Sequence, residues 1–172
     1  MVILVVDGYN IIGAWSELQR LKEIDIGQAR DRLIEMMAEY QAITKYRVII
    51  VFDAYYVKGI EKKEKQYNIE VIFTKEKETA DERIEKLVKK LMNVKTRVYV
   101  ATSDYDEQRT IFGQGALRKS ARELYIELED IRRQIRDRIE EQQKAKPQSK
   151  ALLDVLDKSM VEKLEKMRRG EV

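Results

Sequence analysis

Four short apolar segments, separated by longer amphipathic ones, constrain the fold of this chain more than any other feature. Each segment is rich in Val, Ile or aromatic residues and lacks the polar alternation of a half-exposed strand. Such segments are typical of strands buried on both faces of a parallel sheet. They lie at Val2–Val6, Val48–Phe52, Ile69–Phe73 and Val98–Ala101.

The segments between these strands have the apolar spacing of helices. Apolar residues recur every three or four positions in Ile26–Tyr46 and in Thr79–Met92. Thr79 to Glu82 also has the T-x-x-E pattern of a helix capping box. Because strands and helices alternate, we expect an α/β fold with a central, mostly parallel sheet. Ala116–Lys119 is expected to add a short fifth strand, and the charged run Glu61–Lys65 is expected to be a loop.

The C-terminal part is expected to be helical. Ser120–Glu123 has a capping pattern that opens a long helix to about Gln142. Pro147, the only proline, lies in the polar segment Gln142–Lys150, which predicts a linker or helix break. We therefore predict a domain at residues 1–142, followed at 143–172 by a linker and an amphipathic helix.

Composition excludes several classes of chemistry. The 172 residues include no cysteine and no histidine, which excludes disulfides, zinc fingers and Cys- or His-based catalysis. No apolar run approaches the length of a membrane span, and the opening MVILVV is too short for a signal peptide, so we expect a cytoplasmic protein without membrane contact. The net charge of +3 is too small to indicate nucleic-acid binding by itself.

Acidic residues follow the predicted strands at their carboxyl ends. Asp7 and Asp53 directly follow the first and second strands, and Asp104 and Asp106 follow the fourth. Asp81 lies in the first turn of the helix after the third strand. In a parallel sheet these positions meet at one edge. An all-oxygen pocket of this kind suits Mg²⁺ or Mn²⁺, and such a cation can activate water against a phosphodiester.

A second interpretation of these acids stays open. Asp81, Asp104 and Asp106 fall in first turns of helices, where acidic side chains favour the helix dipole without any ligand. Asp7 is harder to explain in this way, because an aspartate that ends a fully apolar strand loses solvation unless something compensates it. From the residues alone, a metal site and a set of helix caps are about equally supported.

Basic and aromatic residues near the same edge are candidates for binding a phosphate backbone and bases. Arg109, Arg118, Lys119 and Arg122 could hold phosphates, although an ordinary charged surface is the simpler interpretation of each. Aromatic side chains close to the strand ends could stack on bases or pack in the core. They are Tyr9, Tyr55, Tyr56 and Tyr105.

Taken together, the motifs resemble the bacterial YacP-type NYN-domain proteins of the PIN-like nuclease superfamily. The motifs that carry the resemblance are Asp7–Gly8–Tyr9–Asn10, Val51–Ala54, Thr79–Asp81, Thr102–Asp106 and Ser120–Leu124. The resemblance covers roughly residues 1–142. It implies a three-layer PIN-like fold with C-terminal helices, and metal-dependent RNA endonuclease activity on messenger RNA at the ribosome.

The resemblance also implies roles for individual residues. Asp7, Asp81 and Asp104 match the central metal-binding acids of the family, and Asp106 matches a further acid of that cluster. Asn10 and Asp53 match residues at the rim.

We therefore expect a metal-dependent endoribonuclease that prefers single-stranded RNA. In this hypothesis Asp7, Asp81 and Asp104 bind Mg²⁺ or Mn²⁺, Asp106 completes the shell, and Arg118, Lys119 and Arg122 position the RNA. Three alternatives stay open: a catalytically weak RNA- or ribosome-binding module, a small-molecule phosphatase, and an assembly partner. A monomer is expected, with dimerisation through the C-terminal helices as the other possibility.

Overall fold

The computed structural model describes residues 1–54 and 63–170, and its centre is a six-stranded sheet. The strand order is β3-β4-β2-β1-β5-β6, and every neighbouring pair is parallel except β3 with β4. The predicted α/β class and mostly parallel sheet are thus confirmed, including the short strand near residue 117. The strands are β1 (Val2–Asp7), β2 (Arg47–Phe52), β3 (Lys63–Gln66), β4 (Ile69–Phe73), β5 (Arg97–Ala101) and β6 (Leu117–Lys119).

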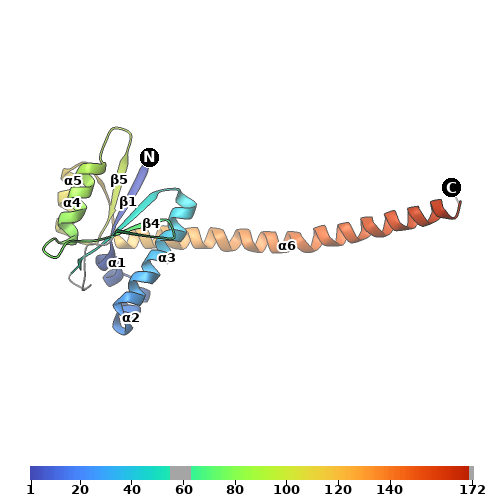
Figure 1. Cartoon of the computed structure of the whole chain (residues 1–172), viewed down its shortest axis with the longest axis horizontal. Helices are drawn as coiled ribbons and strands as arrows, with labels where there is room; N and C mark the ends of the chain where they lie inside the picture. The colour runs from blue at the N-terminus through green and yellow to red at the C-terminus, as the bar shows by residue number, and fades with distance from the viewer. Residues whose placement is uncertain (55–62, 171–172) are drawn as a thin grey trace. The chain divides into compact units, whose positions relative to one another are not determined.

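Helices cover both faces of this sheet, which gives the expected three layers (Figure 1). Helices α4 and α5 lie on one face, and α1, α2 and α3 lie on the other. The capping box at Thr79 is formed as predicted, since the Thr79 side chain accepts from the Glu82 amide and the Glu82 side chain accepts from the Thr79 amide. The helices are α1 (Gly8–Ala14), α2 (Ser16–Ile24), α3 (Ile26–Thr44), α4 (Ala80–Leu91), α5 (Tyr105–Gly113) and α6 (Ala121–Arg168).

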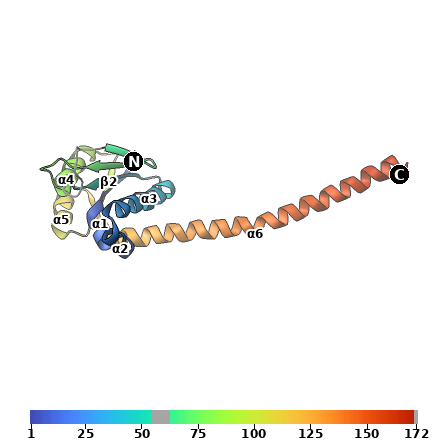
Figure 2. The ribbon, with the colours of Figure 1, turned by 60° about the horizontal axis from the view of Figure 1, so that its bottom comes forward.

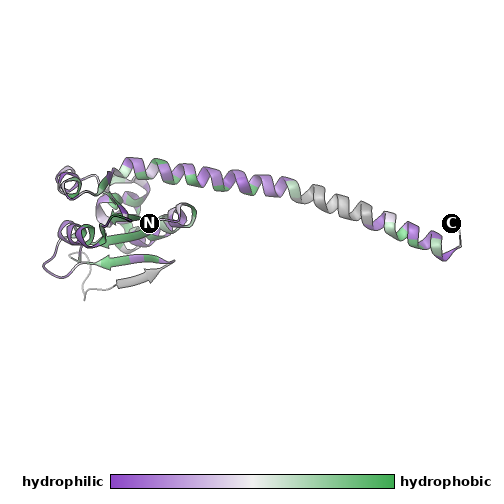
Figure 3. Cartoon of the chain, turned by 90° about the horizontal axis from the view of Figure 1, so that it is seen from above, coloured by the Kyte–Doolittle hydropathy of each residue, from purple (hydrophilic) through white to green (hydrophobic). Residues whose placement is uncertain are grey.

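The core forms where the apolar strands meet the apolar faces of the helices. Alternate residues of β1, such as Ile3 and Val5, pack with Ile84 and Val88 of α4 in one buried cluster. Burying each such side chain contributes roughly 1.5–3 kcal/mol. The mostly green strands near the N label, on the left of Figure 3, show how apolar this layer is. This packing fixes the carboxyl ends of β1 and β5 beside the start of α4.

Strand β3 corrects the loop predicted at Glu61–Lys65. Residues 63 to 66 form an antiparallel edge strand on β4, whereas residues 61 and 62 lie outside the described part of the chain. The connection is a two-residue turn in which Tyr67 and Asn68 both have positive φ, 51° and 66°. Such turns match the twist of a hairpin. The prediction missed it because Tyr-Asn is a weaker signal than Asn-Gly, and because charged residues also protect sheet edges.

Helix α6 corrects the predicted break at Gln142–Lys150. Its backbone is helical from Ala121 to Arg168, through Pro147 (Figure 2). A proline removes one intrahelical hydrogen bond, but the flanking Gln, Lys and Ala residues favour the helix on both sides. The chain divides into two compact units, residues 1–129 and 130–172. The functional domain boundary at residue 142 stays a prediction. No helix in the described residues is both long and apolar enough to cross a membrane.

Candidate metal centre

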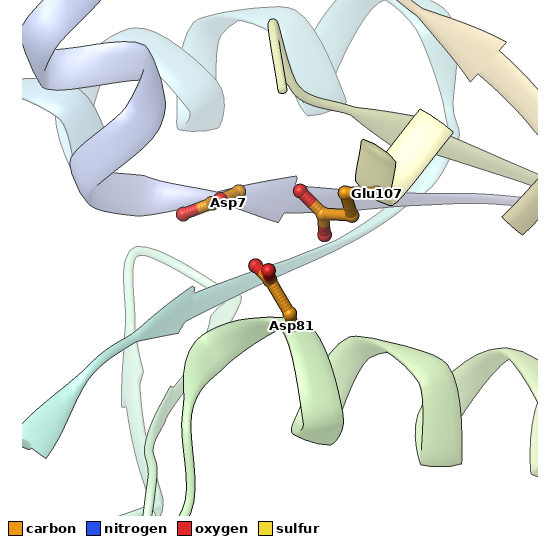
Figure 4. Close-up of side chains that lie close together, drawn as sticks. All are labelled: Asp7, Asp81 and Glu107. Carbon is orange, nitrogen blue, oxygen red and sulfur yellow. The ribbon is translucent and has the colours of Figure 1, made fainter. Parts of the chain in front are cut away.

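Three carboxyl groups from three elements meet at one edge of the sheet. Asp7 ends β1, Asp81 lies in the first turn of α4, and Glu107 lies in the first turn of α5. Each offers an oxygen atom, and these atoms lie within 4.8 Å of one another. Figure 4 shows the carboxyl groups facing one another. They meet because parallel strands end, and the helices that follow them begin, at the same edge.

The position of Asp7 is set by the turn from β1 into α1. Its side chain is buried, and its Oδ1 accepts a hydrogen bond from the Asn10 amide at 3.4 Å, so it caps α1. Gly8 is required by close packing, because a Cβ atom there would lie 2.3 Å from the Phe52 ring. In the DGYN motif, a buried aspartate is therefore followed by glycine, the only residue type that fits beside the Phe52 ring.

Helix α5 is oriented by Asp104, its N-cap. The Oδ1 atom of Asp104 accepts from the amides of Asp106 and Glu107, at 2.9 and 3.2 Å. The Thr102 hydroxyl in turn accepts from the Asp104 amide at 3.1 Å. These bonds fix the first turn of α5, in which Glu107 faces inward and is buried. Asp104 thus positions Glu107 by helix capping.

Loss of solvation and nearby negative charges raise the pKa values of all three carboxyl groups, although Asp81, unlike Asp7 and Glu107, is exposed. Burial, aided by the charges of Asp81 and Asp104, raises the pKa of Asp7 to about 6. Burial and then the charge of Asp7 raise the pKa of Glu107 to about 8. The pKa of Asp81 is also raised, mainly by burial and then by Asp104 and Asp53. Without a partner these acids disfavour their ionised forms.

The three carboxyl groups fit a hard divalent cation. Both carboxyl oxygens of Glu107 are buried and make no hydrogen bond of good geometry among the described residues, although Thr102 and Asp7 lie close enough to influence the pKa of Glu107. Poorly satisfied buried oxygens are costly. A cation would satisfy these oxygens and remove the repulsion. An all-oxygen donor set without His or Cys selects Mg²⁺ or Mn²⁺ over softer metals. Asp7, Asp81 and Glu107 are therefore the residues that could hold it.

Only some of the predicted acids join this cluster. Asp7 and Asp81 lie together, whereas Asp104 and Asp106 are not among the residues that meet within 4.8 Å in the described chain. Asp104 is close enough to raise the pKa values of both, but its carboxylate caps α5. Asp106 is exposed. Asp53 is half-buried, and its charge contributes to the raised pKa of Asp81.

Glu107 is the residue that the sequence analysis missed. It lies three residues after the N-cap Asp104 and four before the buried Ile111, so it belongs to the inward face of α5. An acid at an apolar helical position was the available signal. The strand-end rule did not find it, because Glu107 lies six residues beyond the end of β5 at Ala101, already within the first turn of α5.

Lys119 requires a correction, because it cannot hold a phosphate from its position in the core. Its side chain is buried, and its Nζ atom lies 2.6 Å from Oε2 of Glu127 and donates to the Tyr40 hydroxyl at 3.3 Å. It also lies 5.1 Å from the centre of the Tyr99 ring. Side chains alternate along a strand, so Lys119 faces inward beside the exposed Arg118.

The remaining predicted residues lie around the site or on the surface. Asn10 accepts a hydrogen bond from the Ser103 amide at 2.7 Å, which ties α1 to the loop between β5 and α5. Arg118 and Arg122 are both exposed. Tyr9 contacts the Phe52 ring, with centroids 5.1 Å apart. Tyr55 and Tyr56 lie outside the described residues.

Comparison with known proteins decides the family. Residues 4–169 match the model of the YacP-like NYN domain. The chain belongs to this YacP-like NYN domain family. A relative in Bacillus subtilis (strain 168), described as uncharacterized protein YacP, is 56% identical over 172 residues, which cover 100% of this chain and 99% of the relative. The predicted resemblance is confirmed.

Solved structures of the family share the fold. A crystal structure of Rae1 (YacP) from Bacillus subtilis matches with a TM-score of 0.76 and 56% identity, over 99% of this chain and 97% of that one. A mutant form of Rae1 (YacP) matches with a TM-score of 0.74 and 57% identity, over 82% and 83% of the two chains. Membership of an NYN-domain family supports a nuclease-type function for this chain.

Proposed function

We propose that this protein is a metal-dependent endoribonuclease that hydrolyses RNA phosphodiester bonds, with messenger RNA on the ribosome as its substrate. The observation that carries the proposal is the convergence of Asp7, Asp81 and Glu107, whose oxygen atoms lie within 4.8 Å of one another. The NYN domain supports a nuclease. The ribosomal substrate rests on the resemblance of the five motifs to YacP-type proteins.

The residues divide into ligands and positioning groups. Asp7, Asp81 and Glu107 would hold Mg²⁺ or Mn²⁺, which when bound supplies a Lewis acid and lowers the pKa of water. Asp104 holds the first turn of α5, and with it Glu107, through two hydrogen bonds from backbone amides. Asn10 holds the neighbouring loop through Ser103. These groups keep the three acids in place before substrate arrives, so little reorganisation is needed.

Metal binding and RNA cleavage can be tested on the same variants. Calorimetric titration with Mn²⁺ should show binding to the wild type that is lost in Asp7→Asn and Glu107→Gln. Asp31→Asn, an equal change of charge at an exposed position on α3, is the matched control and should bind normally. Single-stranded RNA and ribosome-bound messenger RNA should be cut by the wild type and by Asp31→Asn, but not by Asp7→Asn or Glu107→Gln. Cleavage that persists in EDTA would overturn the proposal.

The same assay separates a nuclease from a binding module. A catalytically weak RNA- or ribosome-binding protein would bind RNA or ribosomes equally well with Asp7 or Asn at position 7, with or without EDTA. Its binding would weaken with salt, because only phosphate contacts carry it. Such a result, with no cleavage of either substrate, would replace the endoribonuclease by the binding module.

A further inference from the structure

We propose that the exposed face of α5 is a subsite that stacks a nucleobase of single-stranded RNA, an inference that rests on the proposed nuclease function. A hollow of about 330 Å³ opens on this face, and one of its lining residues, Gln108, directly follows Glu107 in the sequence. None of its lining residues belongs to the set of three acids. The hollow is lined by Tyr105, Gln108, Arg109, Phe112 and Arg118.

Two aromatic rings are left in water on this face. Tyr105 is 76% exposed and Phe112 is 68% exposed, although both belong to a short helix on a well-packed domain. They are seven residues apart, so they lie two turns apart on the same side of α5. Planar side chains exposed in this way provide surfaces on which any base can stack.

Two guanidinium groups lie beside the rings. Arg109 and Arg118 are both exposed, and neither forms an ion pair with an acid in the described part of the chain. Arg109 follows Tyr105 by four residues and therefore lies between the two aromatic positions. Guanidinium groups can pair with phosphate and stack on bases, so both suit a nucleotide.

The floor of the hollow is fixed by Gln108. This side chain is buried, its Nε2 atom donates to the Thr102 carbonyl at 2.6 Å, and its Oε1 atom accepts from Nη1 of Arg118 at 3.1 Å. Arg118 is thereby held toward the hollow. On an ordinary charged surface, an arginine side chain is not oriented by a buried amide group as Arg118 is here.

The subsite and the acidic cluster share one helix. Glu107 and Gln108 are adjacent in the sequence, but at 100° per residue Tyr105 and Phe112 lie about 160° and 140° around the helix axis from Glu107, nearly on the opposite side of α5. A helix with its side chains is only about 10–12 Å across. A single strand that bends around the first turn of α5 can therefore place a phosphate at the acids and a base a few nucleotides away in the hollow.

RNA suits this hollow better than an acidic peptide does. An acidic peptide would pair with the guanidinium groups but would leave both aromatic faces in water. A nucleotide satisfies both kinds of group at once, because it carries a phosphate and a planar base. A duplex would keep its bases stacked inside, so the subsite selects single strands.

The test measures binding without cleavage. Every protein carries Asp7→Asn, and the probe is a single-stranded oligoribonucleotide with one 2-aminopurine, whose fluorescence falls on stacking. We expect Phe112→Leu and Tyr105→Leu each to weaken binding at least about fivefold and to restore the fluorescence, because stacking on one aromatic side chain contributes that much. Phe112→Tyr should keep both the binding affinity and the fluorescence quenching of its parent. Arg97→Ala, at the exposed start of β5, is the control and should change neither signal.

The outcomes separate this inference from the proposed function. If Phe112→Leu binds the probe as tightly as its parent and quenches the fluorescence equally, the subsite does not exist. That result would leave the proposed metal binding and RNA cleavage unaffected, because those are measured in separate experiments. If Phe112→Leu weakens binding equally for a probe that is double-stranded around the 2-aminopurine, the single-strand subsite would also be overturned. Loss confined to the single-stranded probe, and absent when the probe lacks that base, supports it.

Discussion

At the scale of single residues, the acidic cluster is costly to the folded protein in the absence of a cation. Asp7 and Glu107 are buried beside each other, and their charged forms lose water and repel. The folded state reduces this cost by holding protons on these groups to a higher pH than the unfolded state does. A cation removes it altogether, so the same residues that would bind metal make the metal-free protein sensitive to pH.

The metal-free protein should lose stability as pH rises. The pKa values of Asp7 and Glu107 are about 6 and about 8, above their ordinary values of 3.8 and 4.5. The folded state therefore binds more protons than the unfolded state, and its stability falls between about pH 4 and pH 8. The loss should be of the order of a few kcal/mol. Urea unfolding in EDTA measures it.

The matched variant for this pH dependence is Glu107→Gln. Above about pH 5, the free energy of unfolding of this variant should depend less on pH than that of the wild type, because the variant lacks the carboxyl group with the highest pKa. A wild-type free energy of unfolding that is flat or rises from pH 5 to pH 8 would contradict the burial of these charges.

Two glycines of α1 give a second residue-scale prediction. Gly8→Ala should destabilise the fold by about 1–3 kcal/mol, because the added Cβ would lie 2.3 Å from the Phe52 ring. Gly13→Ala has no atom within 4 Å of its new Cβ and should stabilise α1 by roughly 0.5–1 kcal/mol. Urea denaturation of the pair measures both. Equal effects would show that Phe52 does not restrict position 8.

At the scale of elements, apolar strands are the part of the fold that sequence predicts best. Strands buried on both faces need an unbroken run of apolar residues, so β1 and β2 were visible without a structure, and with them Asp7. Asp81 was visible because its helix opens with a capping box. Buried polar side chains were not visible: whether Glu107 and Lys119 face inward depends on which neighbours pack against them.

The distinction between a ligand and a cap is also an element-scale question, and Asp104 tests it. Asp104→Ala should destabilise α5 by about 1 kcal/mol, since it removes two hydrogen bonds to backbone amides. Asp104→Asn keeps an acceptor and should stay close to wild type in stability and in Mn²⁺ affinity. A loss of affinity as large as that of Asp7→Asn would place the Asp104 carboxylate on the metal.

At the scale of the whole molecule, the candidate site joins distant parts of the chain. Asp7, Asp81 and Glu107 come from β1, α4 and α5, and all belong to the compact unit of residues 1–129. The unfolded chain has no reason to hold these acids together. Cation binding is therefore linked to the folding of the entire unit rather than to one loop.

Mn²⁺ should accordingly raise the unfolding temperature. At a free concentration 100 times the dissociation constant, binding to the folded state alone adds about 2.7 kcal/mol, or roughly 5–10 °C for a chain of this length. At one fixed Mn²⁺ concentration the rise should be larger at pH 8 than at pH 5, because protons on Asp7 and Glu107 compete with the cation and weaken its binding at pH 5. Differential scanning calorimetry measures it, with Asp7→Asn as the variant that should not respond. A shift of equal size in that variant would place the cation elsewhere on the molecule.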